Sequence, residues 1–362
     1  MKRRTFIKQT TALMAAGALP RLSWAESEFV VNPANLTHRV EDITAPVVFF
    51  IPEVSPSAII KVYDSLKQTI KGKVGFKMTF ETPGGPHLDP QLVKALAQHT
   101  KATLIDNNCF SPRDTTEKHL AVAKENGFDA SIAPIDILDA DGHIDLPVSN
   151  GYHLKFLRTG SHFANYDTLI SVVRFKAHFL DFYGGTLKNL SICMGTGTEG
   201  KCHIHSAGEV MEYFSSRDDQ TTCESMSDAV KAAMEAKPGR WVFINVIDAF
   251  EPQDGCQSAQ NLGNIGILAS YDPVALDQAA IDITFGAAPT AEVRAQWEKQ
   301  HSTMLTTISE QRYWKNTLPI DCTLIALLRF RQKQGAQRTK RADSNEYHHH
   351  AGDTVGISHH SQ

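Results

Sequence analysis

The chain has 362 residues, of which 42% are hydrophobic and 21% are charged, and its formal net charge is -4 at pH 7. These values are typical of a folded globular protein, and the length allows one large domain or two lobes around a cleft. Because there is no surplus of basic side chains to hold a phosphate backbone, we expect no binding to nucleic acids.

The first residues have the pattern of an export signal. Arg3 and Arg4 precede a short apolar stretch at 10–19, and the small-residue sequence at 23–25 resembles a signal cleavage site. The paired arginines resemble the twin-arginine motif, which implies the twin-arginine export machinery as a partner and the periplasm as the destination. Since the apolar stretch is far shorter than the roughly 20 residues of a membrane span, we expect no stable membrane insertion after signal removal. That pathway carries folded proteins, so a cofactor loaded before export is also expected.

Apolar runs of strand length then alternate with helical patterns. Strands are predicted at 47–51, 74–80, 103–105, 169–173 and 241–247, and helices at 58–69, 90–99, 117–127 and 225–236. This alternation indicates βαβ units, and therefore an α/β fold with a mostly parallel sheet flanked by helices.

The end of the chain has a different composition. Periodicity is lost after about Ser302, and beyond Arg329 the chain is rich in Arg, Lys, Gln and His. We therefore predict a signal peptide at 1–25, an α/β domain at 26–300 and an atypical extension at 301–362. Its last thirty residues or so are expected to be disordered.

Glycine, lysine, histidine and cysteine are concentrated between residues 174 and 205. Gly184 and Gly185 would let backbone amides approach a ligand, and Lys188 and Lys201 can neutralise an anion. Lys77, from an earlier strand, is expected to join them. The sequence thus predicts a site for a small anionic ligand.

Residues 195–201 have the G-x-x-x-x-G-K spacing of a phosphate-binding loop. The next position is Cys202, whereas such a loop needs Ser or Thr there to bind magnesium. A periplasmic protein also has no ATP pool, so nucleotide hydrolysis is not favoured.

The same segment carries metal-ligand chemistry. Cys202, His203 and His205, with Cys193 or His178 nearby in the fold, could bind iron, zinc or copper. His203 and His205 point the same way if the segment is extended. The alternative is that the cysteines are buried apolar residues or a disulfide and that the histidines form hydrogen bonds.

A second polar cluster follows the strand at 241–247. Asp254 and Cys256 would lie in the crevice beyond the carboxyl ends of the strands, where ligands bind in open α/β sheets. Asp272, which precedes Pro273, is expected to cap a helix. Asp277 is not expected to cap a helix and is therefore the better candidate for a catalytic group.

Two earlier segments also follow predicted strands. The loop from Glu81 to His87 comes after the strand of Lys77, and Asp106 to Cys109 come after the strand at 103–105. Both lie where an α/β site draws its residues, although Asp and Asn are also common in turns.

Several separate blocks of residues together resemble one known family. The blocks are Lys77 with Pro83-Gly84-Gly85, Arg113 with 116–120, Asp141-Gly142, Gly160-Ser161-His162, Phe175-Lys176 with His178, Gly184-Gly185 with 187–190, Gly200-Lys201, His205, and 266–270 with 272–277.

Over residues 47–285 the chain resembles domain of unknown function 362, an uncharacterised family with some members labelled iron-sulfur centre proteins. The resemblance implies an α/β fold with a polar site and a link to iron-sulfur or other metal chemistry, but no established reaction. The family often has Cys-Asp-Cys where this chain has Asp254-Gly255-Cys256, and the chain has no ferredoxin-type insert.

Three functions follow from these patterns. The first is a periplasmic metal- or iron-sulfur-associated protein, related to redox chemistry, with ligands among His178, Cys202, His203, His205 and Cys256. The second is a metal-assisted hydrolase in which Asp254 or Asp277, with Lys188, acts on the reacting groups. The third is a non-catalytic protein that binds or assembles a metal or cofactor.

Overall fold

The computed structural model describes residues 46–178, 182–215, 217–249 and 263–285. The predicted export signal, the segment with Asp254 and Cys256, and the C-terminal extension lie outside the described residues. Within them, no helix is both long and apolar enough to cross a membrane.

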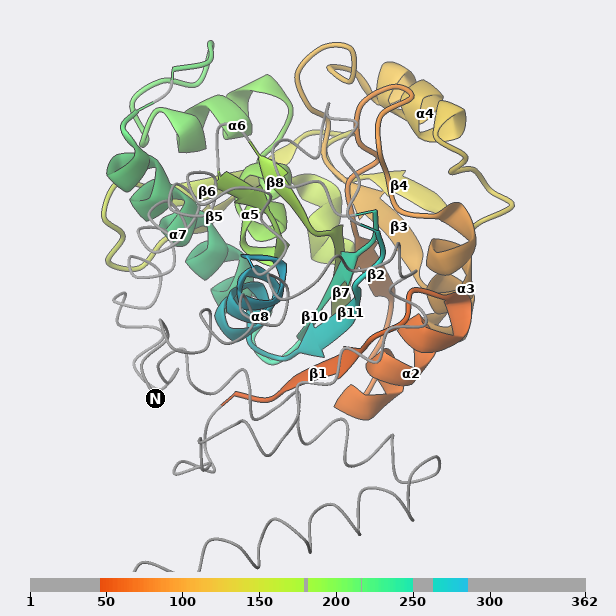
Figure 1. The fold of residues 1–362 in the computed structure, drawn as a ribbon. Coiled ribbons are helices and arrows are strands. Elements are labelled where there is room, and N and C mark those ends of the chain that lie inside the picture. Colours follow the sequence, from red (N-terminus) through yellow and green to blue (C-terminus); the bar gives the residue numbers. More distant parts are fainter. Residues whose placement is uncertain (1–45, 179–181, 216, 250–262, 286–362) are drawn as a thin grey trace, which may run out of the picture.

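A seven-stranded sheet forms the centre of the fold, with the strand order β1-β11-β10-β7-β2-β3-β4 (Figure 1). The strands are β1 (Val48–Ile51), β2 (Val74–Lys77), β3 (Thr103–Asp106), β4 (Ile135–Ile137), β7 (Thr168–Arg174), β10 (Trp241–Ile247) and β11 (Gly266–Ser270). From β10 to β4 all neighbours are parallel, whereas β11 is antiparallel to both β1 and β10. The predicted α/β fold with a mostly parallel sheet is confirmed.

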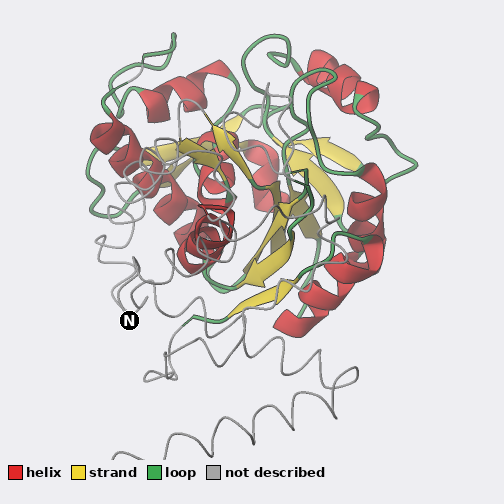
Figure 2. Cartoon of the chain, viewed as in Figure 1, coloured by secondary structure: helices red, strands yellow, loops and turns green. Residues whose placement is uncertain are grey.

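Helices cover both faces of this sheet (Figure 2). One hydrophobic cluster joins the sheet to α2 (Pro56–Leu66), α3 (Pro90–Thr100) and α4 (Thr116–Glu125). The other joins it to α5 (Thr186–Leu190), α6 (Thr198–His205), α7 (Asp219–Ala236) and α8 (Pro273–Phe285). Two-stranded hairpins, β5 (His143–Pro147) with β6 (Phe156–Gly160) and β8 (Lys176–His178) with β9 (Phe182–Gly184), complete the fold with the short 3-10 helices η2 (Ser161–Asn165) and η3 (Ile192–Met194).

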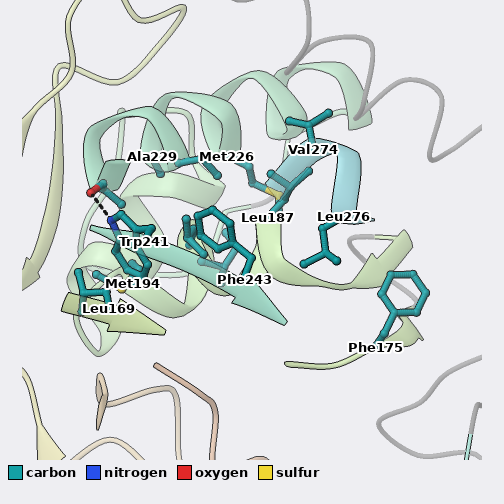
Figure 3. Packing of buried hydrophobic residues seen from close by; sticks show 14 of the residues in the cluster. Leu169, Phe175, Leu187, Met194, Met226, Ala229, Trp241, Phe243, Val274 and Leu276 are labelled. Atoms are coloured by element: carbon teal, nitrogen blue, oxygen red, sulfur yellow. Dashed lines mark hydrogen bonds between the residues drawn. The ribbon is translucent and has the colours of Figure 1, made fainter. Parts of the chain in front are cut away.

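The interior strand β10 shows why this sheet is buried on both sides. Trp241 and Phe243 point into the cluster around α7, and Val242 and Ile244 point into the cluster around α2. The Trp241 indole N–H donates to the carbonyl of Ala233 on α7 at 3.2 Å (Figure 3). Each such side chain stabilises the fold by roughly 1.5–3 kcal/mol when it leaves water.

Short-range signals set the starts of the helices. Ser55 and Asp89 each accept a hydrogen bond from a first-turn amide, and a proline follows each of them as the first helical residue. α7 begins at Asp219, six residues before its predicted start, because Asp218 caps it through the amide of Thr221.

Candidate functional site

Polar side chains gather where the parallel strands β7, β2 and β3 end. Lys77 ends β2, Asp106 ends β3, and Lys176 lies two residues beyond the end of β7. Because neighbouring parallel strands end at the same edge of a sheet, these residues are brought together from distant parts of the chain. We call this region, with Glu81, Arg113 and Lys201, the carboxyl edge.

Lys77 is fully buried and has acceptors for all three of its ammonium protons. It donates to Oδ1 of Asp106 at 2.9 Å, to Oδ1 of Asn189 at 2.9 Å and to the carbonyl of Met78 at 3.0 Å. Lys77 therefore positions its neighbours and has no further proton to offer a ligand.

Asp106 lies between two nitrogen-bearing groups. Nε2 of His119 lies 3.4 Å from its Oδ2, on the side away from the Lys77 contact at Oδ1. Burial opposes the charge of Asp106, but Lys77 and His119 outweigh it and hold the pKa of this carboxyl well below its usual range. Asp106 is therefore ionised at neutral pH.

Lys176 and Glu81 form a second buried ion pair, with 2.6 Å between Nζ and Oε2. Glu81 has a φ of 61°, in the left-handed region that costs a side-chain-bearing residue about 1–2 kcal/mol. Such strain persists only where the surrounding structure enforces it, and it is often found at functional sites.

Lys201 reaches the same edge from α6. Its Nζ lies 2.5 Å from the carbonyl oxygen of Asn108 and 2.7 Å from that of Gly195. At the start of α6, the amide of Gly197, just before the helix, donates to Asp139 at 2.9 Å, and the amide of Gly200 in the first turn donates to the hydroxyl of Thr196 at 3.0 Å. A carboxylate thus stands where a phosphate-binding loop would hold its phosphate.

Arg113 and two cysteines complete the carboxyl edge. The guanidinium donates to the hydroxyl of Thr79 at 3.4 Å, and the Arg113 carbonyl accepts from the amide of Cys109 at 2.7 Å. Burial opposes the charge of Arg113, but Cys109, Asp106, Glu81 and Cys193 raise its pKa. Cys109 and Cys193 are half-buried free thiols, and burial raises the pKa of Cys193.

The segment Cys202–His205 is not extended, because these residues form the end of α6. Residues two apart on a helix point to different sides, so His203 and His205 do not converge. His203 stacks on Phe156 with ring centroids 4.6 Å apart, whereas His205 contacts Phe214. Cys202 is a buried free thiol, as the alternative prediction had it.

The predicted metal ligands are therefore not gathered by the described part of the chain. Its residues contain no group of three or more His, Cys, Asp or Glu side chains that could hold a metal ion. His178 ends β8 and is half-buried, and Cys256 lies outside the described residues. The described residues alone do not fit a bound metal or cluster.

Two aspartates on or before α8 have structural roles. Asp272 accepts from the amides of Val274 at 2.9 Å and Ala275 at 2.8 Å, which confirms the predicted cap. The expectation that Asp277 does not cap a helix is wrong. Asp277 is fully buried and accepts from the amides of Thr186 and Leu187, and from Nδ2 of Asn245, at 2.7–2.9 Å. Its carboxylate therefore caps α5.

The two predicted ligand-binding glycines are needed for side-chain packing. A Cβ at Gly185 would lie 2.7 Å from Oδ1 of Asp277, and one at Gly184 would lie 3.2 Å from Cγ of Lys176. These glycines let Asp277 and Lys176 approach the backbone closely. Lys188 lies on α5 and is half-buried, and Asp254 lies outside the described residues.

Two residues at this site were not identified from the sequence. Asp139 joins the loop after β3 to the start of α6, because it accepts from the amides of Asn108 at 2.8 Å and Gly197 at 2.9 Å. It follows the three-residue strand β4, which is too short to show a pattern. Asn189, which accepts from Lys77, also donates to Ser171 and so ties α5 to β7.

Comparison with known proteins identifies the family of this chain and nothing more specific. None of the curated proteins matches the chain. A crystal structure of a protein from Thermotoga maritima is similar to it at 10% identity with a TM-score of 0.40, over 72% of this chain and 60% of that one. At that TM-score the similarity supports no argument about function. The family model "Domain of unknown function (DUF362)" matches residues 73–282, more than half of the sequence, and the chain therefore belongs to this family.

Proposed function

We propose that the protein binds a small anion at the carboxyl edge, in contact with Lys176, Lys201 and Arg113. The supporting observation is the state of the two buried ammonium groups. Lys176 has one acceptor and Lys201 has two among the described residues, so three N–H groups in all lack a described partner there. Leaving a buried charged donor without an acceptor is costly, and an anion supplies acceptors.

Charge supports the same proposal. Four cationic side chains gather here, namely those of Lys77, Arg113, Lys176 and Lys201, against three described carboxylates, those of Glu81, Asp106 and Asp139. Lys77 is saturated by its own partners, so the contacts to a ligand fall to the other three cations. The hydrogen-bonding capacity of the site suits a carboxylate, sulfate or phosphate group.

Binding can be measured by calorimetry with inorganic sulfate, phosphate and acetate. Lys201→Met removes an ammonium whose present partners are neutral carbonyls, so it leaves no unpaired buried carboxylate. We expect it to weaken binding about 10-fold to 100-fold, the range of a charge-assisted hydrogen bond. Lys61→Met, which removes an exposed lysine on α2, is the matched control and should leave affinity unchanged.

Equal affinity of the Lys201→Met variant and the wild type would refute the proposal. Circular dichroism and a thermal melt establish whether that variant is folded. Arg113→Met provides an independent second test, since the hydrogen bond that the described Arg113 side chain donates is to the neutral hydroxyl of Thr79.

A second proposal concerns redox chemistry. Cys109 and Cys193 are half-buried free thiols, and both raise the pKa of Arg113. Two sulfur atoms, which are soft metal ligands, are therefore available at the carboxyl edge. A metal or iron-sulfur cluster would supply electron transfer there. The described residues lack a third ligand, so this proposal requires Cys256 to join the two thiols. The metal and acid-labile sulfide content of protein purified after export tests it, and a protein with neither would refute it.

Fewer described contacts support the two remaining alternatives, a metal-assisted hydrolase and a non-catalytic binding protein. In the hydrolase proposal Asp277 is not available to act on water, because its oxygens are used by three donors, and Asp254 would have to serve instead. Binding without catalysis requires only the anion site.

Export to the periplasm by the twin-arginine pathway also remains a proposal. It is supported by Arg3 and Arg4, the short apolar stretch and the small residues at 23–25. Replacing both arginines by lysine should retain the protein in the cytoplasm, as measured by cell fractionation. Unchanged periplasmic recovery of this variant would refute the proposal.

A further inference from the structure

His162 bridges two carboxylates next to the carboxyl edge. Its Nδ1 lies 2.7 Å from Oδ1 of Asp136 in β4, and its Nε2 lies 2.8 Å from Oδ2 of Asp141 in the turn after β4. On the far side, Asp136 accepts from the Tyr166 hydroxyl at 2.6 Å, and the ammonium of Lys73 lies 4.5 Å from the Tyr166 ring centroid.

This geometry requires a doubly protonated ring. An ionised carboxylate can only accept hydrogen bonds, so both ring nitrogens of His162 must carry protons to satisfy both contacts. The hydrogen bond to Asp136 is the largest influence on His162, and with Asp141 it raises the pKa of the imidazole above its usual value of about 6.5. The bridge is therefore intact in mildly acidic solution and broken at higher pH.

The bridged turn also carries a residue of the candidate site. Asp139 lies between Asp136 and Asp141 and holds the amides of Asn108 and Gly197. The carbonyl of Asn108 in turn accepts from Lys201. The backbone of the turn is fixed to the start of η2 as well, since the His162 amide donates to the carbonyl of Leu138 at 3.0 Å.

We propose that protonated His162 is a clamp that holds the turn at residues 137–142. Through Asp139 this clamp sets the position of Lys201, so the protonation of His162 controls the affinity of the anion site. The part of this inference that concerns ligand affinity rests on the proposed anion site. The clamp itself rests only on the described contacts.

Loss of the proton should release the exposed end of the clamp. Asp141 is 80% exposed, whereas Asp136 is 19% exposed and is also held by Tyr166. The remaining ring proton is therefore expected at Nδ1, facing Asp136. The lone pair on Nε2 then faces the Asp141 carboxylate, and the turn loses the hydrogen bond between His162 and Asp141.

The first experiment needs no ligand. Nitrogen chemical shifts of His162, measured by NMR from pH 5 to pH 9, report which ring nitrogens are protonated. Hydrogen-exchange protection of the Asn108 and Gly197 amides, corrected for the intrinsic effect of pH, reports how firmly Asp139 holds them. We expect protection to fall about twofold to fivefold as His162 loses its proton, the range of a half-exposed ion pair.

Asp141→Asn is the matched variant. An amide at this position can accept from a protonated Nε2 or donate to a neutral one, so the bridge no longer depends on the proton. Protection of the two amides should then be independent of pH. Protection in the wild type that does not follow the protonation of His162, or a pH dependence equal in both proteins, would overturn the clamp.

The second experiment measures sulfate affinity, because the charge of sulfate is constant over this pH range. Affinity should fall about twofold to fivefold in the wild type as His162 deprotonates, and stay constant in Asp141→Asn. Sulfate that binds equally well at every pH would refute the link to the site. No sulfate binding at any pH would instead refute the anion site, and the amide exchange would still decide the clamp.

Discussion

The ammonium of Lys77 lies 2.9 Å from Oδ1 of Asp106 at the carboxyl edge, and only 0% and 4% of these two side chains are exposed. Each residue ends a neighbouring parallel strand, and each depends on the other for charge compensation. Because a buried charge without its partner is strongly unfavourable, this pair makes the carboxyl edge part of the folded core.

Asp106→Asn should destabilise the protein by about 3–5 kcal/mol, because it leaves the buried ammonium of Lys77 without its counter-charge. Urea unfolding at pH 7 measures the change. The control is Asp114→Asn, which breaks the exposed pair with Lys118 and should change stability far less, because water and salt screen an exposed pair. Equal effects of the two substitutions would contradict the buried-pair account.

Asp277 should make stability depend on pH in the acidic range. Burial raises its pKa to about 6, so the folded chain binds this proton more tightly than the unfolded chain does. The contribution is fully present below about pH 4 and is lost as the pH rises to about 6. Asp277→Asn should remove a component of up to about 3 kcal/mol from the pH dependence, seen by comparing urea unfolding of both proteins at pH 4 and pH 7. Parallel curves for the two proteins would show that Asp277 has an ordinary pKa.

Gly160→Ala should severely destabilise the fold. A Cβ at Gly160 would lie 2.0 Å from the carbonyl carbon of Leu138 and 2.3 Å from the amide nitrogen of Asp139, and backbone atoms cannot rotate out of the way. We expect a loss of about 3 kcal/mol or more in urea unfolding. Gly239→Ala is the control, because its Cβ meets nothing within 4 Å and only its φ of 68° is unfavourable, at about 1–2 kcal/mol. A tolerated Gly160→Ala would show that the turn after β4 is not packed as described.

The cysteine thiols should differ in reactivity. Cys109 and Cys193 are half-buried, whereas Cys202 and Cys223 are buried. Alkylation of the folded protein, followed by peptide mass spectrometry, should modify Cys109 first. Cys193 should react more slowly, because burial raises its pKa and the thiolate is the reactive form. Cys202 and Cys223 should react only after unfolding, and their early modification would contradict their burial.

Much of the fold could be predicted because the sequence patterns that specify it lie within short stretches of the chain. The strand at 241–247 was predicted with the bounds that it has, and α3 and α4 within one or two residues, since caps and hydrophobic periodicity lie in contiguous sequence. The antiparallel strand β11 was not anticipated, because strand direction depends on pairing with β1 and β10.

The candidate site was predicted in part. Lys77 and Lys201 were identified as residues of one polar site, and the structure brings both to the carboxyl edge through Asp106 and Asn108. Asp277 was misjudged, because the helix that it caps begins 91 residues away in the chain. The condition for His203 and His205 to point the same way, an extended segment, is not met, since α6 packs Ile204 into a hydrophobic cluster that residue types alone do not reveal.

The sequence by itself determined the α/β class with its mostly parallel sheet and the helix cap at Asp272, because the alternation of strands with helices and the Asp-Pro pair are patterns of residues that are neighbours in the chain. Only the tertiary structure decided the strand order, the burial of Lys77 against Asp106 and the bridge from Asp136 through His162 to Asp141. These contacts join residues from different elements, and a single sequence carries no measure of the distance between them.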